Sequence, residues 1–416
     1  MPDMSAKIQR FIILINTLVF FTAIQAEAQQ HISLPRTGFT SDDIALIIND
    51  ADPLSRQIGH YYQQARKIPD ENIIHLRFPP NRRVLPIKEF TQLKSIIDER
   101  TRNHIQAYAV AWTEPYRVGC MSLTSALALG FDKKFCSKEC APTAPSPYFN
   151  SPTRYPANDH QIRPAMMLAG LSFEHVKKLI DRGVASDHSF PDGTAYLLST
   201  SDKARNSRSS GFKKAAEEFI GVFAVQLLDT DVIANRRDVL FYFTGLPEVN
   251  MLQSLNFLPG ALADHLTSAG GVLTSSRQMS SLRWLEAGAT ASYGTVVEPC
   301  SYPQKFPAPE VAMFHYAMGA TAIEAYWKSV AWPGQGIFIG EPLAKPFAPT
   351  LRKIDTDQFE LKIFSSHARV FKIEKTAYAT DTFKPIPHKN SIHRRENVLQ
   401  FTFNEKKQGY LRFHWH

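Results

Sequence analysis

Short apolar runs alternate with segments of helical period along most of this chain. The apolar run from Ile44 to Ile48 is followed by apolar residues at helical spacing from Ile58 to Ala65, and then by the run from Ile73 to Leu76. A strand, a helix and a second strand in this order join parallel strands. The pattern therefore predicts an α/β fold with a mostly parallel sheet and helices on both faces, with Asp52 capping the first helix and Pro53 opening it.

Changes in composition predict where the chain divides. Residues 40–130 read as a first βαβαβ unit, and residues 165–350 read as a second α/β unit. Between them, residues 131–164 hold six prolines and two cysteines without a clear period, which indicates a long loop.

Apolar spacing predicts the elements of the second unit. It favours a helix over residues 212–226, a strand from Asp238 to Phe243, and a further helix over residues 262–267. Two helices follow between Glu310 and Val330, and a last strand spans Ile337 to Ile339.

Residues 351–416 change character and predict a small antiparallel β domain. Apolar residues alternate from Leu399 to Phe403 and again from Leu411 to Trp415, which predicts a hairpin across the polar residues 404–409. The segment holds 13 Lys and Arg against 7 Asp and Glu, so it supplies six of the eight net positive charges of the chain. This charge either keeps the domain in solution or attracts an anionic surface such as lipid or acidic polysaccharide. Nucleic acid is not a predicted partner, because the aromatic residues alternate like core positions.

Residues 1–28 have the form of a secretory signal peptide. Lys7 and Arg10 precede an apolar run from Phe11 to Ile24, and Ala26-Glu27-Ala28 has the small residues that signal peptidase requires. The run is shorter than the ~20 residues that span a bilayer. We therefore expect cleavage and a periplasmic or otherwise exported protein without a transmembrane span, although retention of the segment as an anchor is the alternative.

Four cysteines in an exported chain indicate disulfides. Cys136 and Cys140 lie close together in the proline-rich loop and are candidates for one bridge, which leaves Cys300 to pair with Cys120 or to stay free. No metal site is predicted, because no histidine lies near the close pair at ligand spacing.

Polar residues follow most of the predicted strands. The carboxyl ends of parallel strands form the crevice of an α/β sheet, so these residues are candidates for binding a ligand. In three places the residue is a glutamate before proline, which would hold the carboxylate extended beyond the sheet. Without a ligand role, the same residues would serve as turn and cap residues. The candidates are Asn49, Asp50, Glu114, Asp202, Gly245, Glu298 and Glu341.

Asp264, His265 and Cys300 offer a second kind of site. A thiol nucleophile needs a neighbouring base and a third group that orients the base, and these three residues supply all of them. Glu298 is a candidate for acid or base catalysis by carboxylates. His265 has the alternative role of capping or packing at a helix end.

The chain lacks the motifs that bind nucleotide cofactors. It contains no Gly-x-x-x-x-Gly-Lys segment, and the residues after the first strand, Asn49 to Asp52, are not a dinucleotide fingerprint. The cofactor is unknown from sequence, and a nucleotide is not expected.

From residue 42 to about residue 350 the chain resembles an uncharacterised exported bacterial family found in genomes with exosortase protein-sorting systems. The resemblance implies export and a link to surface-protein sorting or exopolysaccharide systems, without an assigned activity. It is carried by Ile48-Asn49-Asp50, Asp52-Pro53-Leu54-Ser55, Tyr61-Tyr62, Ala65-Arg66, Ile68-Pro69, Asp264 to Ser268, Gly288-Ala289-Thr290, Tyr293-Gly294-Thr295, Glu298-Pro299-Cys300 and Ile339 to Leu343.

A more distant resemblance is to the gingipain and caspase-like cysteine peptidases. In that class a strand like Asp238 to Phe243 ends in a Gly-His-Gly turn that supplies the base, and a later strand ends in the nucleophilic cysteine. Here Thr244-Gly245 is followed by Leu246-Pro247, so the histidine is absent, and Cys300 does not clearly match the place of the nucleophile. The resemblance implies a caspase or gingipain-like fold.

Two functional hypotheses follow. The first is a non-catalytic or degenerate domain of this fold that binds an exported protein, a peptide sorting signal or a polysaccharide. The second is an atypical hydrolase that uses the cysteine or carboxylate residues named above. The absent histidine favours the first.

Overall fold

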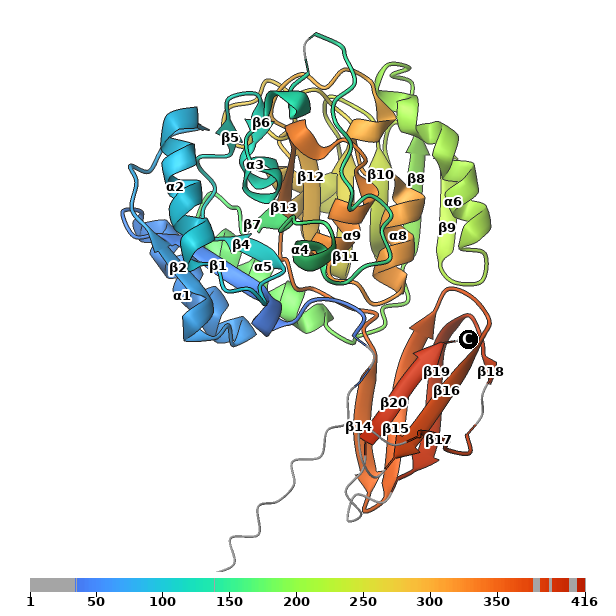
Figure 1. Cartoon of the computed structure of the whole chain (residues 1–416). Helices are drawn as coiled ribbons and strands as arrows, with labels where there is room; N and C mark the ends of the chain where they lie inside the picture. Colours follow the sequence, from blue (N-terminus) through green and yellow to red (C-terminus); the bar gives the residue numbers. More distant parts are fainter. Residues whose placement is uncertain are drawn as a thin grey trace, which may run out of the picture.

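The computed structural model describes residues 34, 36–137, 139–376, 382–388, 391–403 and 410–415. The expected signal peptide, residues 1–28, lies outside the described residues. One ten-stranded sheet runs through the molecule and takes strands from both predicted α/β units (Figure 1). Its order is β2 (Ile73–Leu76), β1 (Ile44–Asn49), β4 (Ala107–Val110), β7 (Ala165–Met167), β13 (Gly336–Gly340), β12 (Ala291–Thr295), β11 (Phe257–His265), β10 (Val239–Thr244), β8 (Thr194–Ser199) and β9 (Ala224–Asp229).

The sheet is mostly parallel. Strands β2, β1, β4 and β7 run parallel to one another, and so do β12, β11, β10, β8 and β9. Strand β13 joins the two groups: it is antiparallel to β12 and shares one register pair with β7, Ile339 with Met167. The predicted α/β fold with a mostly parallel sheet is confirmed.

Helices cover both faces of the sheet. Along β1, Leu46 and Ile48 belong to the apolar core that includes residues of α1, α8 and α9, whereas Ala45 and Ile47 belong to the core that includes residues of α2, α3 and α7. This split follows from the alternation of side chains along a strand. The helices are α1 (Pro53–Arg66), α2 (Ile87–Arg100), α3 (Leu123–Leu129), α4 (Pro156–Asp159), α5 (Phe173–Ser186), α6 (Phe212–Glu218), α7 (Leu282–Ala287), α8 (Pro309–Ala317) and α9 (Ala322–Ser329).

The start of α1 has the predicted cap. The Asp52 carboxylate accepts a hydrogen bond from the backbone N–H of Leu54 (2.9 Å), and Pro53 occupies the first helical position. Local chemistry was sufficient here because a helix N-cap involves only neighbouring residues.

Two predicted helices of the second unit are wrong. Helix α6 ends at Glu218, residues 219–223 form a turn, and only the last three residues of the predicted helix lie in the edge strand β9 (Ala224–Asp229). The predicted helix over residues 262–267 overlaps the end of β11, a strand whose last six residues are all buried. Both faces of the buried strand β11 are apolar, so its sequence has the same continuous hydrophobicity as a short buried helix.

The chain after residue 349 forms antiparallel sheets, here called the C-terminal β unit. One sheet contains β14 (Thr350–Asp355), β15 (Gln358–Ser365) and β19 (Arg395–Thr402). The other contains β16 (Arg369–Thr376), β17 (Lys384–Pro385), β18 (Ser391–Ile392) and β20 (Tyr410–Trp415). The predicted hairpin is wrong, because β19 pairs with β15 and β20 pairs with β16. A third small sheet, β3 (Val84–Leu85), β5 (Arg117–Val118) and β6 (Met121–Ser122), lies beside the main sheet.

The C-terminal β unit packs at the edge of the main sheet where β8 and β9 begin (Figure 1). Phe364 of β15 stacks on Phe223 with ring centroids 5.7 Å apart. Arg395 forms an ion pair with Asp192, just before β8. The unit therefore lies at the end of the sheet opposite to the carboxyl ends of these strands.

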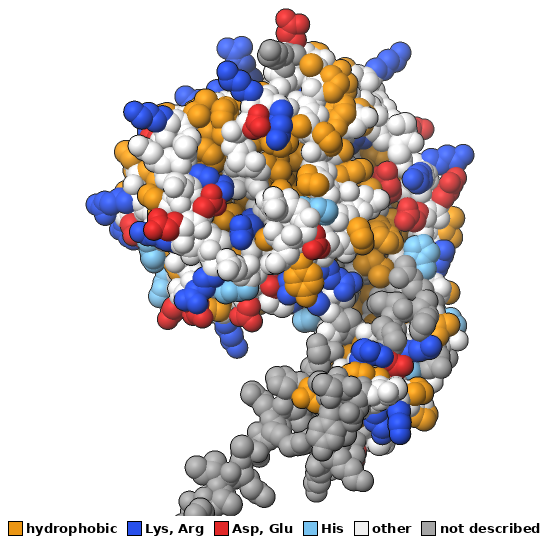
Figure 2. Space-filling model, viewed as in Figure 1, with side chains coloured by type: hydrophobic (Ala, Val, Ile, Leu, Met, Phe, Trp, Pro, Cys, Tyr) orange, Lys and Arg blue, Asp and Glu red, His pale blue; other side chains and the backbone are white. Residues whose placement is uncertain are grey.

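Figure 2 shows Lys and Arg side chains on the visible face of the C-terminal β unit. Ion pairs reduce the effect of this charge. Arg352 pairs with Glu360, Lys362 with Glu396 and Arg412 with Glu374. In the part of the chain that the structure describes, no helix is long and apolar enough to cross a membrane.

Candidate functional site

All four cysteines form disulfides, with pairings that differ from the predicted ones. Cys120 pairs with Cys136, and Cys140 pairs with Cys300. The proline-rich loop lies across the segment that follows β12, where the Tyr302 hydroxyl donates to the backbone oxygen of Cys140 (2.9 Å). Cys300 is therefore a bridge residue without a free thiol, which contradicts its predicted role as a nucleophile.

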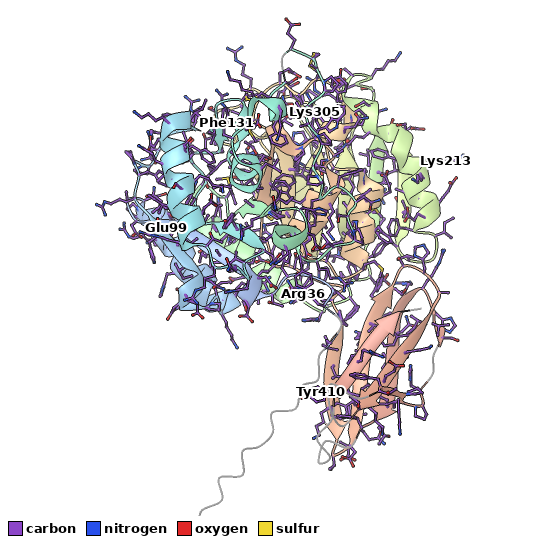
Figure 3. All side chains as sticks on the ribbon, viewed as in Figure 1. Arg36, Glu99, Phe131, Lys213, Lys305 and Tyr410 are labelled. Atoms are coloured by element: carbon purple, nitrogen blue, oxygen red, sulfur yellow. A yellow bond between two sulfur atoms is a disulfide. The ribbon has the colours of Figure 1, made fainter. Side chains whose placement is uncertain are left out.

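Lys305 also binds the proline-rich loop. Its ammonium donates to the Ser137 hydroxyl (3.1 Å) and to the backbone oxygen of Ala141 (3.0 Å), and burial lowers its pKa to about 8. Lys305 lies at the end of the molecule far from Tyr410 of the C-terminal β unit (Figure 3). The loop, the bridge and the lysine together cover one end of β12 and β13.

Asp264 is fully buried and pairs with a buried arginine. Its Oδ1 lies 2.6 Å from Nη1 of Arg208, whose side chain is 3% exposed. The same guanidinium donates to the backbone oxygens of Pro307 (3.0 Å) and Thr244 (2.7 Å). Burial raises the pKa of Asp264 to about 6, while Arg208 acts in the opposite direction. This geometry favours a structural role for Asp264 over the predicted catalytic role.

His265 is the last residue of β11 and is also fully buried. Trp284 Nε1 donates to its Nδ1 (2.9 Å), so its Nε2 carries the proton and donates to the backbone oxygen of Met279 (3.1 Å). Burial lowers the pKa of His265 to about 3. Both ring nitrogens are occupied and the ring stays neutral, which favours packing over the predicted role as a base.

Buried titratable groups predict how stability changes with pH. Burial lowers the pKa of His265 and of His315 to about 3, below the ordinary value of 6.5, and raises that of Asp264 to about 6. Between pH 6 and 4 the unfolded chain therefore binds two protons on the histidines, and the folded chain binds one on Asp264. For these three groups the net difference of one proton lowers the free energy of unfolding by about 1.4 kcal/mol per pH unit on acidification. Urea unfolding at several pH values measures the slope, and His315→Gln should lower it by about 1.4 kcal/mol per pH unit, because it removes one of the protons that the unfolded chain binds.

Glu114 and Glu298 follow strands β4 and β12. The hydroxyl of Thr274, in the loop after β11, donates to the carboxylate of Glu114, so the loops after β4 and β11 meet. Glu298 is exposed, and its carboxylate accepts the backbone N–H of Cys300 (2.8 Å). Glu114 thus contacts the loop after β11, while Glu298 stabilises the turn that carries the disulfide.

Glu341 lies at the opposite edge of the sheet, contrary to the prediction. Because β13 is antiparallel to β12, its last residue, Gly340, pairs with Ala291, the first residue of β12. Glu341 is fully buried there, forms an ion pair with Arg66 and accepts from the Tyr62 hydroxyl (2.9 Å). It ties α1 to the main sheet and lies outside the crevice.

Asn49 is the last residue of β1 and Asp50 follows it. Both lie away from the other candidate residues. The buried Asn49 side chain donates to the backbone oxygen of Phe78 (3.0 Å) and accepts from the backbone N–H groups of Ala51 and Phe78. Its hydrogen-bonding groups are occupied within the protein. Asp50 contacts His75 (2.8 Å) beside a separate depression of about 350 Å³.

Asp202 and Gly245 support the ends of β8 and β10. The Asp202 carboxylate binds Arg205 (2.7 Å), whose Nε donates to the hydroxyl of Thr267 (3.1 Å). A Cβ on Gly245 would lie 1.9 Å from the backbone oxygen of Arg205, so only glycine allows this approach. These residues position the loop that follows β11.

The loop from Leu266 to Ser281, between β11 and α7, forms the candidate site. Gln278 Oε1 accepts from the Thr267 hydroxyl (2.8 Å) and from the backbone N–H of Ala269 (2.8 Å), which closes the loop on itself. The loop and residues that follow β7 and β10 line a depression of about 350 Å³. This depression is here called the strand-end crevice. Its lining includes Leu171, Glu248, Leu273, Arg277, Gln278 and Met279.

None of the site residues predicted from the sequence lies in this loop. Its signal in the sequence is a cluster of serines and threonines with Gln278 between residues 267 and 281. The cluster follows β11, whose last four residues fall in the helix predicted over residues 262–267, so the sequence does not place the loop after a strand.

The comparisons with known proteins found one distant likeness. No protein-family model matches the chain, and no curated protein matches it. A solved structure described as "Structure of Protease" is similar with a TM-score of 0.46 and 10% sequence identity, over 91% of this chain and 98% of that chain. No residue role transfers to this chain at that identity.

Proposed function

We propose that the protein is a non-catalytic, caspase or gingipain-like domain that binds a peptide in the strand-end crevice. The observation that carries the proposal is the chemistry at the ends of β10 and β11. These strands are neighbours, with Thr244 in register with His265. In the resembled peptidases the positions that follow these two strands carry the base and the nucleophile. Here Gly245-Leu246 follows β10 and Leu266-Thr267 follows β11, and neither pair contains a histidine or a cysteine.

The crevice suits a peptide better than a glycan. Its lining combines apolar side chains, hydroxyls, two arginines and two glutamates, without an aromatic ring on which a sugar could stack. Leu171 is 57% exposed at this site, although a leucine is more stable when buried. A bound peptide would cover it.

Export is part of the proposal. Two disulfides are typical of oxidising compartments, and the N-terminal segment has the composition of a signal peptide. The link to surface-protein sorting or exopolysaccharide systems rests on the family resemblance. Binding of the basic C-terminal β unit to an anionic surface stays a prediction. Absence of binding to acidic polysaccharide at low salt would contradict it.

Binding and cleavage of a labelled peptide library separate the two functional hypotheses. We expect binding by fluorescence anisotropy and no cleavage products by mass spectrometry. Leu171→Asp should weaken binding at least about tenfold with little change in stability, because the side chain is already largely exposed. Val398→Asp is the matched control, since Val398 is 51% exposed on β19 of the C-terminal β unit.

Cleavage by the purified wild-type protein would contradict the proposal and favour a carboxylate-based hydrolase. In that case Glu298→Gln should abolish cleavage and leave the melting temperature unchanged. Equal binding by the Leu171 and Val398 variants would place the peptide outside the strand-end crevice.

A further inference from the structure

A second depression, of about 140 Å³, continues the strand-end crevice between α5 and α7. The two depressions share Leu282 and Glu286 as lining residues. His175, Lys178 and Arg182 line the second depression from α5. Their spacing of three and four residues places them on one face of the helix. The crevice therefore continues into a narrower groove with a basic wall.

Arg182 lacks a carboxylate partner among the described residues. Its Nε donates to the backbone oxygen of Ala289 (3.0 Å), and its Nη2 donates to the backbone oxygens of Leu285 (2.6 Å) and Ala289 (2.7 Å). The bond to Leu285 caps the carboxyl end of α7, as cations often do, and the bonds to Ala289 hold the segment that follows the helix. Within the described chain, Nη1 has no hydrogen-bond partner. Burial lowers the pKa of Arg182 to about 10, and no acidic group opposes this effect.

The other charges of the groove leave its basic wall only partly neutralised. Glu286, which lines both depressions, is bound by Arg283 at 2.6 Å and lies 4.0 Å from His175. Lys178 is 68% exposed and contacts Glu174 on its own helix at 3.6 Å, a separation at which an exposed pair interacts weakly. An anionic group that enters the groove would gain the attraction of Arg182 and Lys178.

We infer that the groove between α5 and α7 binds a carboxylate of the peptide that occupies the strand-end crevice. The inference rests on the proposed function, because the remainder of the peptide lies in that crevice. Arginine suits this role because its guanidinium stays charged and keeps Nη1 as a donor after Nε and Nη2 have bound the backbone oxygens. The carboxylate comes either from the peptide C-terminus or from an aspartate or glutamate side chain.

Three pools of fluorescein-labelled hexapeptides test the inference on the full-length mature protein. The first pool lacks Asp and Glu and has a free C-terminus, the second is the same pool with an amidated C-terminus, and the third is amidated and contains one Asp. We expect the first or the third pool to bind at least about tenfold more tightly than the second.

Lys178→Gln should reduce that preference about threefold without affecting the fold, because the side chain is exposed. Arg182→Lys keeps the charge, but a lysine cannot make all three of these backbone hydrogen bonds and still offer a donor to the peptide, so it should reduce the preference further. The matched control is Lys213→Gln on α6, a helix that does not line the groove (Figure 3). Its side chain is 83% exposed, against 68% for Lys178, and it contacts Glu217 on its own helix.

The outcomes separate the two proposals. Preference for the first pool identifies the C-terminal carboxylate, and preference for the third identifies a side-chain carboxylate. Equal binding of all three pools, unaffected by Lys178→Gln, overturns the carboxylate site and leaves peptide binding intact. Absence of binding by every pool at millimolar peptide overturns the proposed function and the carboxylate site together.

Discussion

Asp264→Ala is expected to lower the free energy of unfolding by about 3–5 kcal/mol. The substitution leaves the guanidinium of Arg208 buried without its carboxylate partner, and the side chain of Arg208 is only 3% exposed. Two backbone oxygens still accept from this guanidinium, but they carry no full charge to compensate it. Urea unfolding followed by circular dichroism measures the change.

A double variant distinguishes loss of the ion pair from loss of packing. Arg208→Met combined with Asp264→Leu removes both charges and keeps most of the apolar volume, so it should recover much of the stability that Asp264→Ala loses. A catalytic Asp264 would behave differently. Its replacement would abolish turnover while leaving the free energy of unfolding within about 1 kcal/mol of the wild type.

Removal of the Cys140–Cys300 disulfide should destabilise the protein by about 4–5 kcal/mol. The bridge joins residues 160 positions apart, so its loss restores much conformational freedom to the unfolded chain. The variant Cys140→Ser with Cys300→Ser, compared with the wild type by chemical unfolding, measures the effect. The loop that Lys305 contacts should also become more accessible to proteolysis.

The other disulfide is the matched control. Cys120 and Cys136 are 16 positions apart, so the corresponding double serine variant should cost less, about 3 kcal/mol. Alkylation before and after reduction, with mass spectrometry, checks the pairing itself. A free, fast-reacting Cys300 in the unreduced protein would contradict the observed bridge and restore the hypothesis of a thiol nucleophile.

Some strand ends beside the candidate site were predictable, because strand ends have a recognisable sequence. Glu114 and Asp202 were identified from their positions after apolar runs, and both lie at strand ends in contact with the loop after β11 or with the arginine that supports it. Glu341 was selected by the same rule and lies at the other edge. The rule assumes parallel strands, and β13 is antiparallel to β12.

The apparent Asp264, His265 and Cys300 constellation shows why residue types alone were insufficient. All three residues exist, but Asp264 is neutralised by Arg208, His265 is held by Trp284, and Cys300 is bridged to Cys140. Each partner comes from a different part of the chain. Spacing in the sequence carries no information about such contacts.

By itself, the sequence determined the features that depend on local chemistry: the α/β class, the cap of α1 by Asp52, and the antiparallel strands of the C-terminal β unit. Period and turn composition act between residues that are close along the chain. The tertiary structure alone decided the strand order, the direction of β13, the disulfide pairs and the strand-end crevice. These depend on which buried surfaces meet and on how distant charges neutralise one another, and both are properties of the packed chain.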